Sequence, residues 1–251
     1  MRPASILLLV TFLFAAAAGL AGETDPYLWL EEVEGEKALA WVEERSAADT
    51  AELEAVPEFA EIQEQLLEIF NSSDRIPYPV VRGDWAYNFW QDQDHVRGIW
   101  RRTSVASYLT ESPDWETVID LDALAEAEDE NWVWKGARGL YPAYEKFLVT
   151  LSRGGGDAAV IREFDVTTGE FVADGFMLPE AKSMISWKDE DTVWVGTDFG
   201  EGTMTNSGYA RQVKQWRRGT PLESAELIYE CSVDDVFAYG FTMHTPEGNY
   251  D

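Results

Sequence analysis

The stretch YEKFLVTLSRGGGDAAVIREFDVTTGEFV, residues 144–172, decides the fold of this chain. It predicts an antiparallel meander with an apolar, β-rich run at 147–151, a return at 158–165 and a third strand at 170–172. Glycines occupy both turns, where they adopt positive φ angles without strain. Because apolar residues fall on both faces of these strands, we expect a sheet that is covered on both sides.

Similar groups of strands precede and follow this meander. Their closing strands centre on Val118, Val172 and Ile228, about 55 residues apart, slightly more than the usual 40 to 50 of radial β-repeats. The pattern predicts a mainly β protein that contains about three blades of a β-propeller. An ordinary antiparallel sandwich with evenly spaced hairpins is the alternative.

The first 22 residues have the features of a secretory signal peptide. A single basic residue, Arg2, precedes an apolar run at 6–18, and small residues continue through Gly22. We therefore expect an exported protein, periplasmic or extracellular, whose mature chain starts close to Gly22 or Glu23. An uncleaved membrane anchor is the alternative.

An acidic, helical arm is predicted for residues 23–76. One helix is expected over residues 36–53, and a second helix from Pro57, a residue that suits a first helical turn. The second helix carries an apolar stripe at helical spacing, formed by Phe59, Ile62, Leu66 and Ile69. Prolines at 77 and 79 then end the helical pattern, and residues 77–251 are expected to form the propeller blades.

The composition excludes several kinds of partner. The 251 residues carry a formal net charge of −28, so nucleic acid would be repelled and anionic lipid would not be attracted. After signal cleavage, we expect no membrane partner. Cys231 is the sole cysteine, and the chain therefore forms no internal disulfide.

The sequence contains no local signature of a catalytic, cofactor-binding or metal-binding residue. There is no G-x-S-x-G nucleophile elbow. The two histidines, His95 and His244, have no cysteine or carboxylate at metal-ligand spacing. The acidic stretch at 120–131 lacks the spacing and central glycine of an EF-hand, and we expect it to form a short helix or loop with a solvated face.

The N-terminal motif DPYLWLEE at 25–32, followed by Trp41-Val42-Glu43, resembles the opening of the prolyl oligopeptidase family of serine peptidases. Tyr87-Asn88-Phe89 and Ser186-Trp187 are similar to blade motifs of the same family. The resemblance implies an α/β-hydrolase domain interrupted by a seven-bladed propeller, of which this chain supplies the helical arm and roughly three blades. The hydrolase domain, with its catalytic Ser, Asp and His, is expected to be absent from this chain.

The same resemblance implies a serine endopeptidase that acts on short peptides, with the propeller as a size filter. The chain alone is then expected to be inactive. Prolyl-specific members tend to carry an aromatic residue where this chain has Lys182, before Ser183. A cation at that wall would weaken a strict preference for proline, unless Lys182 is an ordinary exposed loop lysine. The alternative function is a stand-alone secreted propeller-like binding protein without enzymatic activity.

Overall fold

The computed structural model describes residues 25–32, 34–72 and 74–251. The predicted signal peptide, residues 1–22, lies outside the described residues. The chain divides into two compact units, Met1–Glu68 and Ile69–Asp251. Among the described helices, none is long and apolar enough to cross a membrane.

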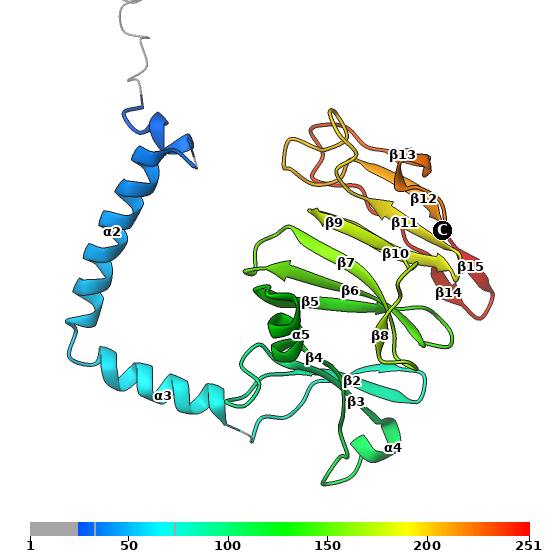
Figure 1. Ribbon diagram of the computed structural model, residues 1–251, viewed down its shortest axis with the longest axis horizontal. Helices are drawn as coiled ribbons and strands as arrows, with labels where there is room; N and C mark the ends of the chain where they lie inside the picture. The colour runs from blue at the N-terminus through cyan, green and yellow to red at the C-terminus, as the bar shows by residue number, and fades with distance from the viewer. Residues whose placement is uncertain (1–24, 33, 73) are drawn as a thin grey trace, which may run out of the picture. The chain divides into compact units, whose positions relative to one another are not determined.

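The described part of the first unit is helical, as predicted. It contains the short 3-10 helix η2 (Leu28–Glu31), α2 (Glu36–Glu54) and most of α3 (Phe59–Asn71) (Figure 1). Trp29 of η2 packs edge-on against Trp41 of α2, with 6.1 Å between the ring centroids. The predicted start of the second helix at Pro57 is wrong by two residues, since Pro57 and Glu58 form a turn before Phe59.

The second unit begins with a four-stranded antiparallel sheet, called the first sheet. Its strands follow chain order: β1 (Val80–Arg82), β2 (Trp85–Trp90), β3 (Ile99–Ser104) and β4 (Glu116–Asp120). The short helix α4 (Val105–Tyr108) connects β3 to β4. Helix α5 (Leu121–Glu128) follows β4, so the acidic stretch contains the short helix that was one of its two expected forms.

The second sheet contains the predicted meander as β6 (Lys146–Arg153), β7 (Ala159–Asp165) and β8 (Glu170–Phe171). Two strands that the sequence did not predict complete it: β5 (Trp132–Gly139) pairs with β6, and β9 (Met177–Ala181) pairs with β7.

The third sheet repeats the arrangement. Its strands are β10 (Met184–Asp189), β11 (Thr192–Gly196), β12 (Gln212–Arg217) and β13 (Glu226–Glu230), with the 3-10 helix η3 (Leu222–Ser224) before β13. A hairpin of β14 (Met243–Thr245) and β15 (Gly248–Tyr250) follows. The described chain thus contains three successive antiparallel meanders, which confirms a mainly β unit with about three blades.

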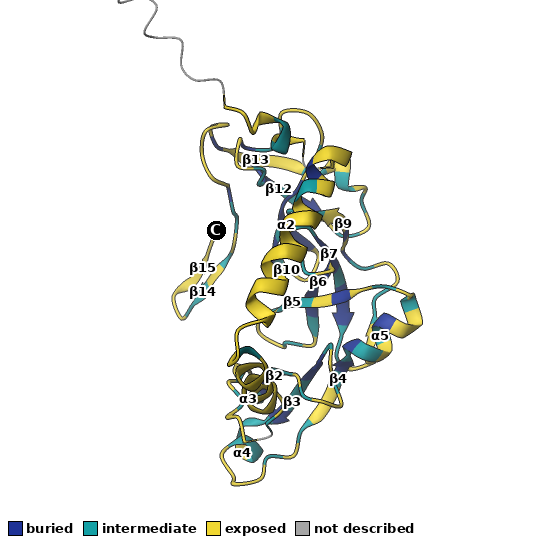
Figure 2. Ribbon diagram, turned by 90° about the vertical axis from the view of Figure 1, so that its left-hand side faces the viewer, coloured by how far each residue is buried: buried dark blue, intermediate teal, exposed yellow. Residues whose placement is uncertain are grey.

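The core lies between neighbouring sheets. Alternate residues of β6 enter two different apolar clusters: Phe147, Val149 and Leu151 pack toward the first sheet, while Leu148 packs toward the third. All four are almost completely buried, and much of β6 and β7 is coloured as buried in Figure 2. The expectation of a sheet covered on both sides is therefore confirmed.

Candidate functional site

Two adjoining pockets lie along the first strands of the three sheets. The first, here called the aromatic pocket, has a volume of about 790 Å³ and is lined by residues 75–78, by β1 and β2, and by Trp100, Trp134 and Phe147. The second, called the first-strand pocket, has a volume of about 1070 Å³ and is lined by Arg82 of β1, by β5, by β10 and by residues 237–244. Arg82, Gly136 and Ala137 line both.

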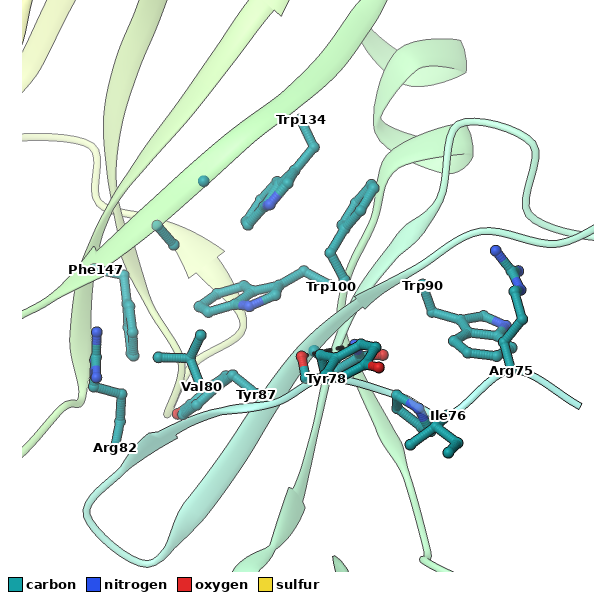
Figure 3. Close-up of a pocket in the computed structure, with 15 residues that line it drawn as sticks. Arg75, Ile76, Tyr78, Val80, Arg82, Tyr87, Trp90, Trp100, Trp134 and Phe147 are labelled. Carbon is teal, nitrogen blue, oxygen red and sulfur yellow. Dashed lines mark hydrogen bonds between the residues drawn. The ribbon is translucent and has the colours of Figure 1, made fainter. Parts of the chain in front are cut away.

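Stacked rings form one wall of the aromatic pocket (Figure 3). Trp134 of β5 stacks on Phe89 of β2 with 5.3 Å between centroids and an interplanar angle of 3°. Trp100 lies 5.3 Å from Trp134 and packs edge-on against Phe147 at 4.9 Å. Such ring contacts fix large apolar surfaces in one geometry, and this wall therefore offers a preformed apolar face to a ligand.

The first-strand pocket is held together by contacts between the sheets. The Trp187 indole Nε1–H of β10 donates to the carbonyl oxygen of Arg138 in β5 at 2.8 Å. The Ser186 hydroxyl donates to the carbonyl oxygen of Gly240 at 2.7 Å. His244 stacks on Tyr141 with 4.4 Å between ring centroids. These contacts join second-sheet, third-sheet and C-terminal residues around one cavity.

A β-bulge shapes the wall that β5 contributes. The pairing of β5 with β6 shifts between Trp134 and Gly136, so that Lys135 is the extra residue. Gly136 has a φ of +133°, a conformation that favours glycine. Lys135 and Arg138 are three positions apart and would alternate to opposite faces of a regular strand. The bulge resets the alternation, and both residues line the first-strand pocket.

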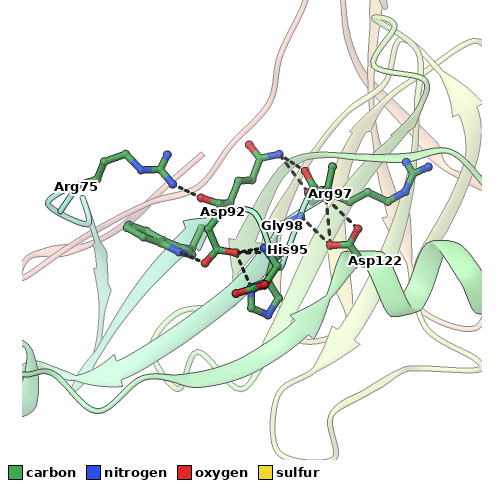
Figure 4. Close-up of polar contacts among 10 residues, drawn as sticks. Arg75, Asp92, His95, Arg97, Gly98 and Asp122 are labelled. Atoms are coloured by element: carbon green, nitrogen blue, oxygen red, sulfur yellow. Dashed lines mark hydrogen bonds and ion pairs between the residues drawn. The ribbon is translucent and has the colours of Figure 1, made fainter. Parts of the chain in front are cut away.

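A hydrogen-bonded turn at Asp92 (Figure 4) follows Trp90, which lines the aromatic pocket. Asp92 accepts hydrogen bonds from the indole of Trp90 at 2.8 Å and from the backbone and ring nitrogens of His95, both at 2.9 Å. Partial burial raises the pKa of Asp92, but these bonds and one from the Asp94 amide outweigh it and lower the pKa to about 2. The turn holds Trp90 in place beside Arg75, whose guanidinium lies 4.6 Å from the indole.

The two histidines lie in different parts of the unit. His95 contacts Asp92 in the turn after β2, whereas His244 bonds through Nδ1 to Asn249 Oδ1 at 2.8 Å across the β14–β15 hairpin. In the part of the chain that the structure describes, neither bonds to a serine hydroxyl. Nor do the described residues include a group of three or more potential metal ligands.

The acidic stretch at 120–131 makes hydrogen bonds and ion pairs with the rest of the unit, whereas a solvated face was expected. Asp122 accepts from the backbone amides of Arg97 at 3.0 Å and Gly98 at 3.4 Å. Glu128 pairs with Arg162 at 2.8 Å, and Glu130 with Arg153 at the same distance. These carboxylates were expected to face solvent. They instead tie α5 and the residues after it to the first and second sheets.

Lys182 follows β9 and does not line either pocket. Its Nζ lies 3.5 Å from Asp157 Oδ2 and 4.9 Å from the centre of the Tyr209 ring. The pocket residues themselves were missed in the sequence because Arg82, Lys135 and His244 are far apart along the chain. The signal that could have found them is Lys135-Gly136-Ala137-Arg138, two cations around a glycine within a strand.

Comparison with known proteins gives these pockets a context. The family described as prolyl oligopeptidase, N-terminal beta-propeller domain, matches residues 21–250. An uncharacterized peptidase of Sinorhizobium fredii is 41% identical over 228 residues, covering 90% of this chain and 31% of that protein. A prolyl endopeptidase of Elizabethkingia miricola is 26% identical over 208 residues, 82% of this chain and 28% of that protein.

A solved structure of similar fold is described as a post-proline cleaving enzyme from Rickettsia typhi. Its TM-score is 0.76 with 31% sequence identity, over 83% of this chain and 31% of that chain. The chain thus spans about three-tenths of the length of the relatives that it matches.

Proposed function

Because the chain belongs to the prolyl oligopeptidase family and matches its N-terminal β-propeller domain, we propose that it is the propeller region of a serine peptidase that cleaves short peptides. In this role the blades bind and filter the substrate, and a separate hydrolase domain performs the chemistry. The relatives are named as peptidases and prolyl endopeptidases, which supports this assignment.

The observation that carries the proposal is the pair of adjoining pockets on the first strands. Propeller blades radiate around a central channel. The strands that converge on one cavity are therefore the inner strands, here β1, β5 and β10. With volumes of about 790 and 1070 Å³, the two pockets can hold a few residues of an extended peptide.

This arrangement suits a filter. A peptide that fits these pockets must be short and extended, because together they hold only a few residues and β1, β5 and β10 form much of their walls. The packed rings of Trp100 and Trp134 offer apolar contact, and the β5 bulge leaves Lys135 outside the strand pairing, where its backbone can bond to a peptide. Short peptides can satisfy both, whereas a long chain or a folded protein does not fit.

We further propose that the chain by itself is inactive. Hydrolysis by a serine peptidase needs a hydroxyl nucleophile, a histidine base within hydrogen-bond reach, and an acid that orients it. Within residues 25–32, 34–72 and 74–251, neither histidine bonds to a serine hydroxyl: His95 contacts Asp92, and His244 contacts Asn249. The triad would be supplied by a hydrolase domain encoded beyond this chain.

A length series tests the filter. The gene is sequenced in frame past codon 251, and the protein encoded by the whole reading frame is expressed. It is assayed with proline-containing reporter peptides of increasing length and with an unfolded protein. We expect cleavage of short peptides, inhibited by a serine-directed reagent, and a steep fall in rate with length. Equal rates for short peptides and for the protein would contradict the filter. A gene that ends at codon 251, with no hydrolysis, would favour the stand-alone binding protein.

Export is a second part of the proposal. It rests on the short basic start, the apolar run and the small residues of positions 1–22. N-terminal sequencing of secreted or periplasmic material should find a first residue close to Gly22 or Glu23. Recovery of the protein with an intact Met1 would contradict cleavage.

A further inference from the structure

The charges of this acidic chain are unevenly distributed. The sequence has 47 acidic and 19 basic residues. Nevertheless, among the described residues that line the aromatic and first-strand pockets there is no aspartate and no glutamate. Both pockets contain cations instead: Arg75, Arg82, Lys135 and Arg138. The concave face of the first strands is therefore basic in a molecule that carries a net charge of −28.

These four cations differ from the other basic residues of the second unit in their partners. Most of the other cations form ion pairs with carboxylates, for example Arg162 with Glu128 and Arg218 with Glu163. None of the four pocket cations forms an ion pair within the described part of the chain. The Arg82 and Arg138 guanidiniums lie over tyrosine rings, at 5.8 and 5.4 Å from the centroids. Ring contacts leave their positive charge uncompensated.

Lys135 is likewise free of a carboxylate in the described structure. Its Nζ donates to the carbonyl oxygen of Gly155 at 2.9 Å, and its side chain is exposed. The Gly136 bulge is what brings Lys135 and Arg138 to the same pocket, where Arg82 of β1 also lies. Three positive charges from two sheets therefore line one cavity.

A concave wall of one sign, backed by closely packed strands, focuses its electric field on whatever enters. Guanidinium groups also match the geometry of a carboxylate, to which they can donate two parallel hydrogen bonds. From this we propose that the first-strand pocket recognises a carboxylate on the peptide substrate through Arg82, Lys135 and Arg138. The carboxylate belongs either to an acidic side chain or to the free C-terminus. This inference rests on the proposed function and adds a preference for peptides that present a carboxylate to this pocket.

The test uses the whole gene product and matched reporter peptides. One set places Glu, Gln or Lys at the same position beside the cleaved bond, with amidated C-termini, and a second set compares free-acid with amidated neutral peptides. The ratio of kcat/KM for the Glu and Gln peptides reports an acidic side chain, whereas the ratio for acid and amide reports the C-terminus. We expect at least one ratio above unity, and it should fall as salt is raised, because screening weakens charge recognition.

Variants locate the effect. Arg82→Gln, Lys135→Gln and Arg138→Gln should each lower the preferred ratio by about two- to fivefold, the range expected for removing one solvent-accessible charge contact. The control, Lys146→Gln, Lys214→Gln and Arg217→Gln combined, removes three positive charges that do not line either pocket and should leave the ratio unchanged. Thermal melts of all variants check that the fold is retained.

The outcomes separate the two proposals. If neutral peptides are cleaved but both ratios are close to unity, the carboxylate preference is wrong and the peptidase function stands. If no peptide is cleaved, the peptidase function is wrong, and fluorescence anisotropy with labelled Glu and Gln peptides still measures recognition. Equal affinity for the two peptides would then overturn the carboxylate preference, as would a control variant that lowers the ratio as much as the pocket variants do.

Discussion

The Arg218 guanidinium donates to both carboxylate oxygens of Glu163, at 2.9 and 3.1 Å, and so ties the third sheet to the second. The Glu163 side chain is completely buried and also accepts a hydrogen bond from the Phe176 amide at 2.8 Å. The pair lies at the boundary between two blades, where their apolar faces meet in a single cluster. Stability of the described blades therefore depends on contacts between sheets as well as within them.

Removing one partner of this pair should be strongly destabilising. Arg218→Ala leaves a buried carboxylate without its counter-charge, and we expect the free energy of unfolding to fall by about 3 to 5 kcal/mol. Denaturant unfolding measures the change. The neighbouring Arg217 is exposed and forms no ion pair among the described residues, so Arg217→Ala is the matched control and should change stability little. Equal effects of the two substitutions would contradict this view of the pair.

The bulge in β5 predicts an effect that is due to backbone conformation alone. A Cβ at Gly136 would meet no atom within 4 Å, but the residue has a φ of +133°. Gly136→Ala should therefore cost about 1 to 3 kcal/mol of stability from backbone strain without any steric clash. Gly156→Ala is the control, because that position is equally open and has no positive φ. Thermal melts in which both variants match the parent would contradict the predicted backbone strain at position 136.

The turn at Asp92 predicts a pH dependence. Its pKa is lowered to about 2 in the folded protein, from 3.8. A lowered folded-state pKa gives stability that is present above the unfolded-state value and is lost as pH falls. Asp92 should therefore contribute fully above about pH 4 and lose its contribution between about pH 4 and pH 2. Asp92→Asn should flatten that part of the stability curve, measured by denaturant unfolding across this pH range. Parallel curves for Asp92→Asn and the parent would contradict the assignment.

The sequence predicted the blades where the apolar pattern is regular and missed them where it is interrupted. The run Phe147-Leu148-Val149 is apolar on both faces, and the structure buries both. Strand β5 was not predicted, because Lys135 and Gly136 interrupt its alternation of apolar and polar residues at the bulge. The candidate pockets could not be found from sequence, since they arise only when β1, β5 and β10 converge.

Helix α3 predicts where the isolated chain is vulnerable to protease. Within the described structure it buries none of its residues, and Ile62, Leu66 and Ile69 of its predicted apolar stripe are all exposed. Each large apolar side chain gives about 1.5 to 3 kcal/mol when buried, so an uncovered stripe leaves the helix poorly stabilised. Limited proteolysis of residues 25–251 should cut first between residues 36 and 75 and leave the second sheet intact longest. The uncovered stripe and open strand edges should also promote self-association.

A monomer with a sharp cooperative melt and a protected arm would contradict this prediction. Size-exclusion chromatography and mass spectrometry of the early fragments distinguish the outcomes. That result would also favour the stand-alone binding protein over the propeller region of a larger peptidase.

The most direct test of the central claim is turnover of a proline-containing reporter peptide by residues 25–251 and by the whole gene product, side by side. If the propeller region binds the substrate and a separate hydrolase domain cleaves it, residues 25–251 should show no turnover above background. The whole product should show turnover that a serine-directed reagent abolishes. Turnover by residues 25–251 that the same reagent blocks would reveal a nucleophile within this chain and contradict the claim.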